Sequence, residues 1–342
     1  MKQILITGGA GFIGSNYVRY VLNKYPDCHV TVLDALTYAG NMDNLADLSG
    51  PRMDFVHGDI RDREIVDGLI HNSDAVVNFA AESFVDRSIL EPDAFITTDI
   101  LGTYVLLEAA RKHGIERFLH VSTDEVYGDV QEGSSLETAA ILPNSPYSAS
   151  KAGGDLLAHS YFMTYGIPVV ITRGSNTYGP YQHPEKLIPL FVTNAIDDQP
   201  LPLYGDGMQV RDWLHVIDHC EGIDLVLHKA PPGEVYNVGG GNERANVQIT
   251  DLILKYLDKP ASLIKHIADR PGHDRRYSID TTKLRNLGWQ PKYEFESGLR
   301  ETVKWYRDNP TWWRKIKEEK EYRRFSKEWY GERREHGTGN RE

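Results

Sequence analysis

The chain has 342 residues, of which 40% are hydrophobic and 25% are charged, and its formal net charge is −11. This length is enough for a large core in one or two domains. The negative charge argues against general binding to nucleic acid or anionic membranes, and no stretch is long and apolar enough to span a bilayer. The N-terminus runs directly into an expected strand rather than a signal peptide, and Cys28 and Cys220 are far apart, which favours a reduced, cytoplasmic protein.

Strands and helices are expected to alternate through the first half of the chain. Short β-branched runs predict strands at Lys2–Ile6, Val30–Leu33, Asp54–His57, Ala75–Phe79, Arg117–Ser122 and Val169–Thr172. Helical patterns between them cover Ile13–Lys24, Arg63–Ile70, Thr97–His113 and Ser148–Tyr165. This alternation predicts an α/β fold with a Rossmann-type doubly wound parallel sheet, covered by helices on both faces.

The pattern loosens after Arg173, where prolines and glycines cluster. Helices are expected at Leu187–Asp197, Ile249–Leu257 and Phe295–Asn309, and Glu234–Val238 is expected to rejoin the first sheet. We therefore expect a Rossmann domain from residues 1–173 plus about 214–240. A smaller C-terminal α/β substrate domain is expected from about 174–213 and 241–315.

The tail at residues 316–342 is dense in Lys, Arg and Glu. Tryptophans at 305, 312, 313 and 329 can pin parts of the end of the chain to the core. The favoured interpretation is a solvated helix followed by a frayed end, and a binding tail is the alternative.

A glycine-rich turn joins the first expected strand to the first helix. Gly8, Gly11 and Gly14 there allow a tight turn and close approach of the backbone to a pyrophosphate, and Phe12 and Ile13 of the same turn are also expected to bind the cofactor. The helix N-terminus then presents free N–H groups and partial positive charge to phosphates. Asp34, 20 residues beyond Gly14, can accept hydrogen bonds from both ribose hydroxyls and repels a 2′-phosphate, which favours NAD over NADP. The alternative is a structural turn with Asp34 as a helix cap.

Later strand ends extend the expected cofactor path. Asp59 and Ile60 follow the third strand, where an adenine can be held, and Phe79, Ala80 and Ala81 follow the fourth.

Two further segments carry chemistry. The fifth strand leads directly into Thr123, Asp124 and Glu125, and ligands of open parallel sheets bind at the carboxyl ends of strands. Tyr147 and Lys151 are four residues apart on an expected helix, so they share a face. We expect the ammonium to lower the tyrosine pKa, which suits a base for a sugar hydroxyl.

The two adjacent carboxyl groups exceed what alcohol oxidation needs. Oxidation of a sugar C4 hydroxyl makes the C5 proton acidic; a base can remove that proton while an acid protonates the departing C6 hydroxyl, and the hydride can then return to C6. This requirement favours removal of water. The alternative is that Asp124 and Glu125 only solvate a loop or cap a turn.

At these residues the chain resembles the extended short-chain dehydrogenase/reductases and, within them, the dTDP-glucose 4,6-dehydratases. The segment 122–128, with Thr-Asp-Glu before Val-Tyr-Gly, is the most specific match, and the resemblance extends to about Trp313. It implies that Thr123 bonds the hexose, Asp124 is the acid, Glu125 is the base at C5, and Tyr147 with Lys151 forms the redox pair.

The resemblance also implies bound NAD, a nucleoside-diphosphate sugar substrate, and a place in deoxysugar biosynthesis. It adds Thr37 and Asn176 to the cofactor residues. The residues that it implies for the substrate pocket are Ser83, Thr123, Asn176, Lys186, Leu187, Pro202, Tyr204, Arg211, Asn246, Arg270, His273 and Tyr277. The planar donors of Arg211 and Arg270 suit a pyrophosphate.

The sequence departs from the usual family pattern at four places. Phe84 stands for His, Asp99 for Asn, and Gly174 and Thr177 for Cys and Asn. A substrate such as UDP-glucose or another NDP-hexose therefore stays open, as do a 4-epimerase or decarboxylase and a non-catalytic dinucleotide sensor. The 13 histidines show no metalloenzyme spacing, so no metal is expected.

The helix pattern at Thr97–Arg111 is apolar on more than one side, through Ile100, Leu101 and Tyr104. One side can cover the sheet and the other needs a partner. Together with Ser148–Tyr165 it predicts a four-helix homodimer contact, which the resemblance also implies. The alternative is burial under the chain's own substrate domain.

Overall fold

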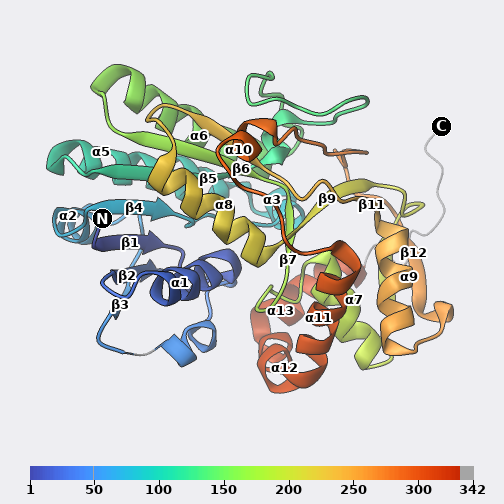
Figure 1. Cartoon of the computed structure of the whole chain (residues 1–342). Coiled ribbons are helices and arrows are strands. Elements are labelled where there is room, and N and C mark those ends of the chain that lie inside the picture. The colour runs from blue at the N-terminus through green and yellow to red at the C-terminus, as the bar shows by residue number, and fades with distance from the viewer. Residues whose placement is uncertain (49, 332–342) are drawn as a thin grey trace.

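The computed structural model of the chain describes residues 1–48 and 50–331 (Figure 1). Its centre is a seven-stranded sheet in the order β10-β6-β5-β4-β1-β2-β3, and every pairing in it is parallel. The strands are β1 (Gln3–Thr7), β2 (His29–Asp34), β3 (Met53–His57), β4 (Ala75–Asn78), β5 (Arg117–Thr123), β6 (Val169–Gly174) and β10 (Val235–Val238). The predicted fold class is confirmed, and so is the return of the chain to the first sheet at β10.

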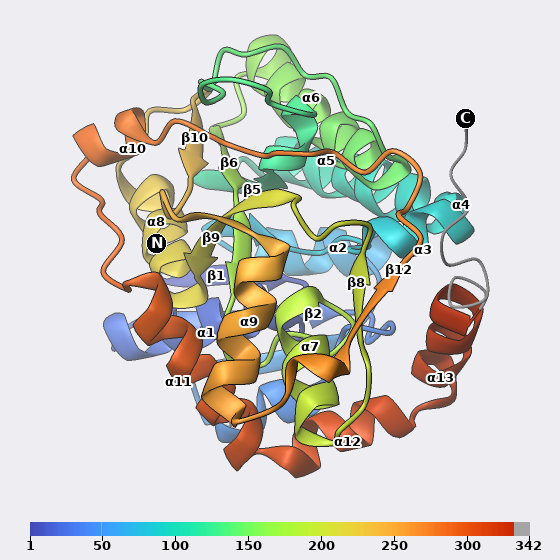
Figure 2. The same cartoon turned by 90° about the vertical axis from the view of Figure 1, so that its right-hand side faces the viewer.

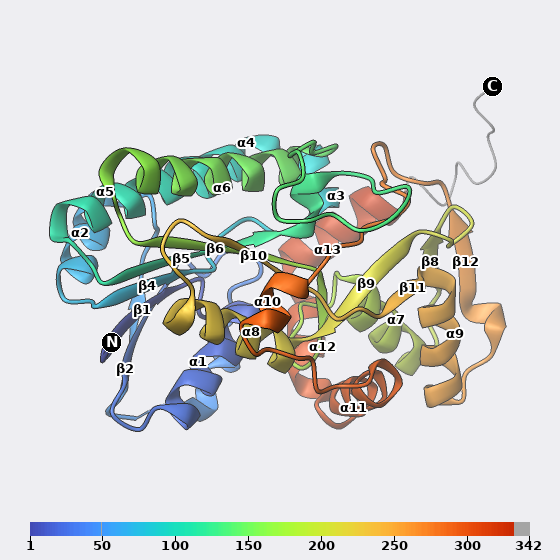
Figure 3. The same ribbon diagram turned by 45° about the horizontal axis from the view of Figure 1, so that its top comes forward.

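Helices cover both faces of this sheet (Figure 3). One face carries α1 (Phe12–Lys24) and α8 (Val216–Lys229), whose apolar sides share a buried cluster with β1 and β2. The other carries α2 (Arg63–His71), α5 (Thr103–His113) and α6 (Pro146–Tyr165). Burial on both faces explains why the strands read as continuous apolar runs rather than as alternating ones.

The helix expected at Thr97–His113 has two parts. Ile96–Gly102 is a π-helix, and only α5 after it is regular. Within the π-helix, the Asp99 carboxylate accepts hydrogen bonds from the Glu82 amide at 2.9 Å and from the Ser150 hydroxyl at 2.6 Å. Wider turns of this kind often occur beside functional sites.

A second layer follows β6 (Figure 2). It holds a three-stranded sheet, β11 (Glu243–Ala245), β9 (Val210–His215) and β7 (Asn176–Tyr178), and a pair, β12 (Ile264–Ile267) and β8 (Leu201–Tyr204). Its helices are α7 (Leu187–Ile196), α9 (Asn246–Leu257) and α11 (Phe295–Asp308). The shorter elements are α3 (Val85–Leu90), α4 (Pro92–Phe95), α10 (Thr282–Asn286), and 3-10 turns at Met42–Asn44, Ala46–Leu48, Asp124–Tyr127 and Ala261–Leu263.

The end of the chain is packed rather than solvated. After α12 (Pro310–Glu318), the chain forms α13 (Lys320–Ser326) and a π turn at Lys327–Gly331. The side chains that it buries are Trp313, Ile316, Tyr322, Phe325, Trp329 and Tyr330. The pinning role of Trp313 and Trp329 is confirmed, whereas the solvated-helix interpretation is wrong for this part of the tail. The predicted frayed end at 332–342 lies outside the described residues.

The physical reason is an amphipathic spacing within the charged run. Tyr322, Phe325 and Trp329 stand at positions i, i+3 and i+7, so they form one apolar stripe despite their charged neighbours. None of the helices within residues 1–48 and 50–331 combines the length and apolar character that a membrane crossing requires.

Candidate active site

Two joined cavities lie where the strands of the large sheet end. The larger, of about 300 Å³, is lined by residues that follow β1, β2, β4 and β5. The smaller, of about 160 Å³, reaches into the second layer. Glu125, Tyr147, Asn176 and Lys186 line both cavities, so the two form one continuous site. A site outside the carboxyl ends of parallel strands is the usual position for this architecture.

The site contains all the residues that the sequence predicts to be catalytic or to bind cofactor or substrate. Every residue predicted to hold the cofactor lines the larger cavity, as do the five predicted catalytic residues. Every residue predicted to hold the substrate lines the smaller one, apart from Thr123, which lines the larger. Their binding and catalytic roles stay predictions.

The glycine turn is shaped by close backbone contacts. Gly8 has a φ of +68°, and a Cβ added to it would lie 2.6 Å from the Ala80 amide nitrogen. A Cβ added to Gly14 would lie 2.2 Å from the Gly8 carbonyl oxygen. Gly11 begins α1 with no side-chain hydrogen bond at the cap. The first turn of α1 therefore faces the cavity with free N–H groups, as an anion site requires.

Asp34 closes the same end of the site. Its carboxylate accepts hydrogen bonds from the Ala10 amide at 2.9 Å and the Leu36 amide at 2.8 Å. It is buried, lines the larger cavity, and keeps lone pairs beyond those two bonds. Burial raises its pKa, and the two amide bonds oppose that change. The carboxylate thus fixes the turn and still has acceptor capacity toward a ligand.

The carboxyl end of β5 delivers the two adjacent acids. Thr123 caps the 3-10 turn Asp124–Tyr127: its hydroxyl oxygen accepts from the Glu125 amide at 3.3 Å and donates to Asp124 Oδ1 at 3.3 Å. Gly128 ends this turn with a φ of +75°, and a Cβ there would lie 2.2 Å from the Leu142 carbonyl oxygen. This close contact constrains the backbone of the turn, which in turn fixes the positions from which the Asp124 and Glu125 side chains extend.

The surroundings separate the two acids. Burial raises the pKa of Asp124 well above its usual range, and the negative charges of Glu125 and Asp212 add to that rise. Its Oδ2 atom is buried and has no hydrogen-bond partner among the described residues. Burial also raises the pKa of Glu125, and the cations Arg270, Arg211 and Lys186 oppose that rise without cancelling it. Asp124 is thus favoured as the protonated acid and Glu125 as the carboxylate.

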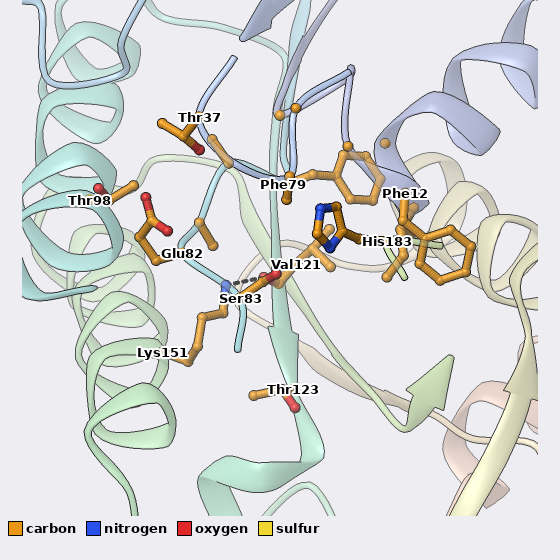
Figure 4. Close-up of a pocket in the computed structure, with 18 of the residues that line it drawn as sticks. Phe12, Thr37, Phe79, Glu82, Ser83, Thr98, Val121, Thr123, Lys151 and His183 are labelled. Atoms are coloured by element: carbon orange, nitrogen blue, oxygen red, sulfur yellow. Dashed lines mark hydrogen bonds between the residues drawn. The ribbon is translucent and has the colours of Figure 1, made fainter. Parts of the chain in front are cut away.

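Tyr147 and Lys151 start from a well-defined helix N-terminus. Ser145 caps α6 in a reciprocal capping box with Ser148, which sets the rotation of the first two turns. The Lys151 ammonium donates to the Val121 carbonyl oxygen at 2.8 Å, as the dashed line in Figure 4 shows.

The expected effect of Lys151 on the tyrosine is wrong for this structure. Burial raises the pKa of Tyr147 well above its usual range, and the charges of Glu125 and Asp99 add to it, while the Thr123 hydroxyl lowers it. Lys151 is itself buried, and burial lowers its pKa. Burial of the phenol is the largest influence on its pKa, which explains why the expected lowering is not seen.

The smaller cavity is rich in cationic and aromatic groups. Arg270 forms an ion pair with the buried Asp86 at 2.7 Å, and Asp86 also accepts the Tyr204 hydroxyl at 2.7 Å. Arg211 donates to the Asp274 carbonyl oxygen and lies 4.2 Å over the Tyr277 ring. Several buried polar atoms of the cavity have no protein partner among the described residues: Arg270 Nε, Asn176 Oδ1 and Asn246 Oδ1. A polar ligand with both donors and acceptors fits such a lining.

The four departures from the family pattern have structural partners. Phe84 is buried against the Phe325 ring at 5.6 Å, and Asp99 bonds Ser150 and Glu82 as described. Gly174 and Thr177 meet at one ring: a Cβ on Gly174 would lie 2.5 Å from the His219 imidazole, and the Thr177 hydroxyl lies 2.8 Å from its Nδ1.

Some lining residues escaped prediction from the sequence. Gln182 and His183 line the larger cavity from a loop, and Tyr330 lines the smaller one from the tail. Nothing local marks the loop residues. In the tail, the apolar stripe of Tyr322, Phe325 and Trp329, which Tyr330 follows directly, indicates a packed segment.

Fold and site together define a Rossmann-type dinucleotide-binding protein with a Tyr-x-x-x-Lys pair, the class of the extended short-chain dehydrogenase/reductases. A family model described as GDP-mannose 4,6 dehydratase matches residues 5–302. A dTDP-glucose 4,6-dehydratase of Streptomyces niveus is 52% identical, over 92% of this chain and 96% of its own length. A low-salt glycan biosynthesis protein of Haloferax volcanii is also 52% identical, over 89% of this chain and 98% of its own length. The chain belongs to the sugar-nucleotide 4,6-dehydratase family.

Two solved structures with NAD bound have a fold similar to that of this chain. A dTDP-glucose 4,6-dehydratase of Streptomyces venezuelae, solved with NAD bound, has a TM-score of 0.90 and 53% identity, covering 92% of this chain and 99% of that one. A UDP-glucose 4-epimerase of Thermus thermophilus, also solved with NAD, has a TM-score of 0.84 and 33% identity, covering 90% and 99%.

Proposed function

We propose that this protein catalyses the NAD-dependent dehydration of dTDP-glucose to dTDP-4-keto-6-deoxyglucose, a hydro-lyase reaction of deoxysugar biosynthesis. The observation that carries the proposal is the pair of unlike acids, Asp124 and Glu125, in one cavity with Tyr147. The reaction comprises oxidation at C4, loss of water across C5 and C6, and reduction at C6. The dTDP-glucose 4,6-dehydratases that are 52–53% identical to this chain support both the reaction and the thymidine nucleotide.

The chain's own groups account for each proton. Tyr147 would accept the C4 hydroxyl proton, and its phenolate would be favoured once a ligand brings compensating positive charge to the site. Glu125, beside three cations, would remove the C5 proton. Asp124, favoured as the neutral acid, would give its proton to the departing C6 hydroxyl, so that it leaves as water. Thr123 would orient the hexose through its hydroxyl.

The cavity residues fit a dinucleotide. The free N–H groups of α1 and the absence of side chains at Gly8, Gly11 and Gly14 suit a diphosphate, and Asp34 suits a ribose diol. Bound NAD supplies the acceptor and then the donor of one hydride. Lys151 would hold the nicotinamide ribose. We further assign the large sheet to the cofactor and the second layer to the sugar nucleotide, with the domain limits expected from the sequence.

Two alternatives stay open to test. Another NDP-hexose, such as UDP-glucose, would use the same acids, because one base methyl in a pocket is worth only about 1–3 kcal/mol. A 4-epimerase would use Tyr147 and Lys151 alone, and it leaves Asp124 and Glu125 without a task.

We infer a homodimer and a cytoplasmic location, as predicted from the sequence. The dimer is supported by exposed apolar side chains on the π-helix and α6: Leu101 is 43% exposed, Leu156 54% and Met163 67%. These gather on the two helical segments expected to pair, and exposed apolar patches mark interaction sites. Sedimentation velocity at micromolar concentration should give a dimer, and a monomer would contradict this inference.

Mass spectrometry after incubation with dTDP-glucose and UDP-glucose in competition, without added NAD, tests the function. Loss of one water from dTDP-glucose is expected, whereas an unchanged mass with an altered sugar identifies an epimerase. Glu125→Gln should abolish the loss of water while the purified protein keeps its NAD. Exposed Glu296→Gln on α11 is the control and should behave as the wild type.

A further inference from the structure

The segment Lys320–Gly331, here named the C-terminal segment, lies outside the part of the chain that the family model matches. That model ends at residue 302, and the Streptomyces venezuelae relative covers 92% of this chain while it is itself covered to 99%.

The C-terminal segment is tied to the wall of the substrate cavity by polar contacts. Arg87 donates to the buried Glu185 at 2.9 Å and to Glu321 of the segment at 2.9 Å. The Tyr322 hydroxyl donates to the Pro184 carbonyl oxygen at 3.1 Å. These contacts join the segment to α3 and to the loop before α7, which line the smaller cavity through Val85, Asp86 and Glu185.

Apolar contacts reinforce this attachment. The Phe325 ring lies 5.6 Å from Phe84 and 4.6 Å from the Arg87 guanidinium. Phe84 is one of the departures from the usual family pattern, where a polar His is expected. The Phe84 ring packs against the Phe325 ring of the C-terminal segment, so the residue that departs from the family pattern and the segment are packed together.

The end of the segment reaches the cavity itself. The Trp329 indole donates to the Tyr204 hydroxyl, and the Tyr330 ring lies 6.5 Å from the Tyr204 ring at an interplanar angle of 30°. Tyr330 lines the cavity together with Arg270 and His273, and it is only 6% exposed.

The position of Tyr330 indicates which part of the ligand it meets. Glu125 and Tyr147 mark the hexose end of the site, where the two cavities join. Tyr330 instead packs on Tyr204, whose hydroxyl shares Asp86 with Arg270, a predicted diphosphate ligand. An aromatic ring beside a cationic pair suits a nucleoside diphosphate.

We propose that the C-terminal segment completes the wall of the nucleotide-sugar pocket and that Tyr330 contacts the nucleoside-diphosphate part of the substrate. This inference rests on the proposed function for the identity of the ligand. It makes Tyr330 a substrate-binding residue contributed by a region beyond the part of the chain that the family model matches. Affinity for the nucleotide, rather than the rate of the chemical steps, should depend on this residue.

Calorimetric titration of the full chain with dTDP, together with steady-state kinetics on dTDP-glucose, tests the proposal. Tyr330→Ala should weaken dTDP binding and raise KM by about tenfold, the equivalent of about 1.4 kcal/mol, and leave kcat within about twofold. Tyr330→Phe keeps the ring and should stay close to the wild type. Glu328→Ala, an exposed change in the same turn, is the matched control. Retention of NAD should be equal in all variants.

A Tyr330→Ala variant with the dTDP affinity and KM of the wild type would overturn the proposal. A Glu328→Ala variant that loses as much dTDP affinity as Tyr330→Ala would also overturn it. If Tyr330→Ala does not fold, trypsin cleavage of the wild type within the C-terminal segment decides: dTDP should slow it, and an unchanged rate overturns the proposal. Binding of dTDP without turnover of dTDP-glucose would refute the proposed function alone. Turnover with an unaffected Tyr330→Ala would refute this inference alone.

Discussion

Replacement of Asp124 by Asn should remove activity and raise stability at the same time. Asp124 is 3% exposed, its Oδ2 atom has no partner among the described residues, and its pKa is raised by burial and by Glu125. Folding therefore favours the protonated carboxyl. The stability that Asp124 contributes is complete at low pH and is lost as the pH rises through its raised, folded-state pKa. Asparagine cannot ionise, so it avoids that loss.

The size of the effect follows from the buried atom. Asparagine leaves the same buried position unpaired but uncharged, and an unpaired buried charge costs more than an unpaired neutral group, so Asp124→Asn should gain about 1–3 kcal/mol near pH 8. At about 2.1 cal/mol/K of unfolding entropy per residue, 342 residues convert this gain into a rise in Tm of about 1–4 °C. Loss of a general acid should lower kcat about 10²- to 10⁴-fold.

Differential scanning fluorimetry near pH 8 and pH 4, with product analysis by mass spectrometry, measures both effects. The gain in Tm should shrink toward about pH 4, where the unfolded carboxyl also becomes protonated. Exposed Asp251→Asn on α9 is the control and should change stability by less than about 0.5 kcal/mol. Normal turnover in Asp124→Asn, or a lower Tm at both pH values, would refute the reasoning.

The other predictions concern Asp99, whose charge acts on Tyr147, and the glycine turn. Asp99 has a pKa raised to about 6 by burial, and its charge raises the pKa of Tyr147. Asp99→Asn should thus raise kcat/KM near pH 6.5 about fivefold, the equivalent of about 1 kcal/mol of removed repulsion; a fall at every pH would show that Asp99 chiefly supports Lys151. Gly14→Ala places a Cβ 2.2 Å from the Gly8 carbonyl oxygen. The substitution should lower the free energy of unfolding in urea by about 1–3 kcal/mol and reduce the amount of NAD that purifies with the protein. A variant with wild-type stability and NAD content would contradict this prediction.

Much of the site was predictable because its chemistry is local in sequence. Tyr147 and Lys151 share a helix face by the periodicity of the helix, and Asp124 and Glu125 follow a strand whose carboxyl end must lie at the binding edge. The Phe84 departure was visible in the sequence, but its reason was not, because Phe325 is 241 positions away along the chain.

Composition misled the prediction for the tail. A run dense in Lys, Arg and Glu is usually solvated. Here the tail is packed, because burial of the Tyr322, Phe325 and Trp329 rings stabilises the docked helix more than its charged side chains favour exposure.

The sequence by itself determined the parallel sheet, the glycine turn and the identities of the acids and bases. These depend on periodicity, on turn chemistry and on the order of elements, all of which are written in neighbouring residues. The tertiary structure decided the ionisation of those groups and the far wall of the pocket. The pKa of Tyr147 depends on burial and on Asp99 from another helix, and Tyr330 reaches the cavity only because the chain end packs beside Tyr204. Electrostatics and packing act through space, and no local pattern records which distant residues become neighbours.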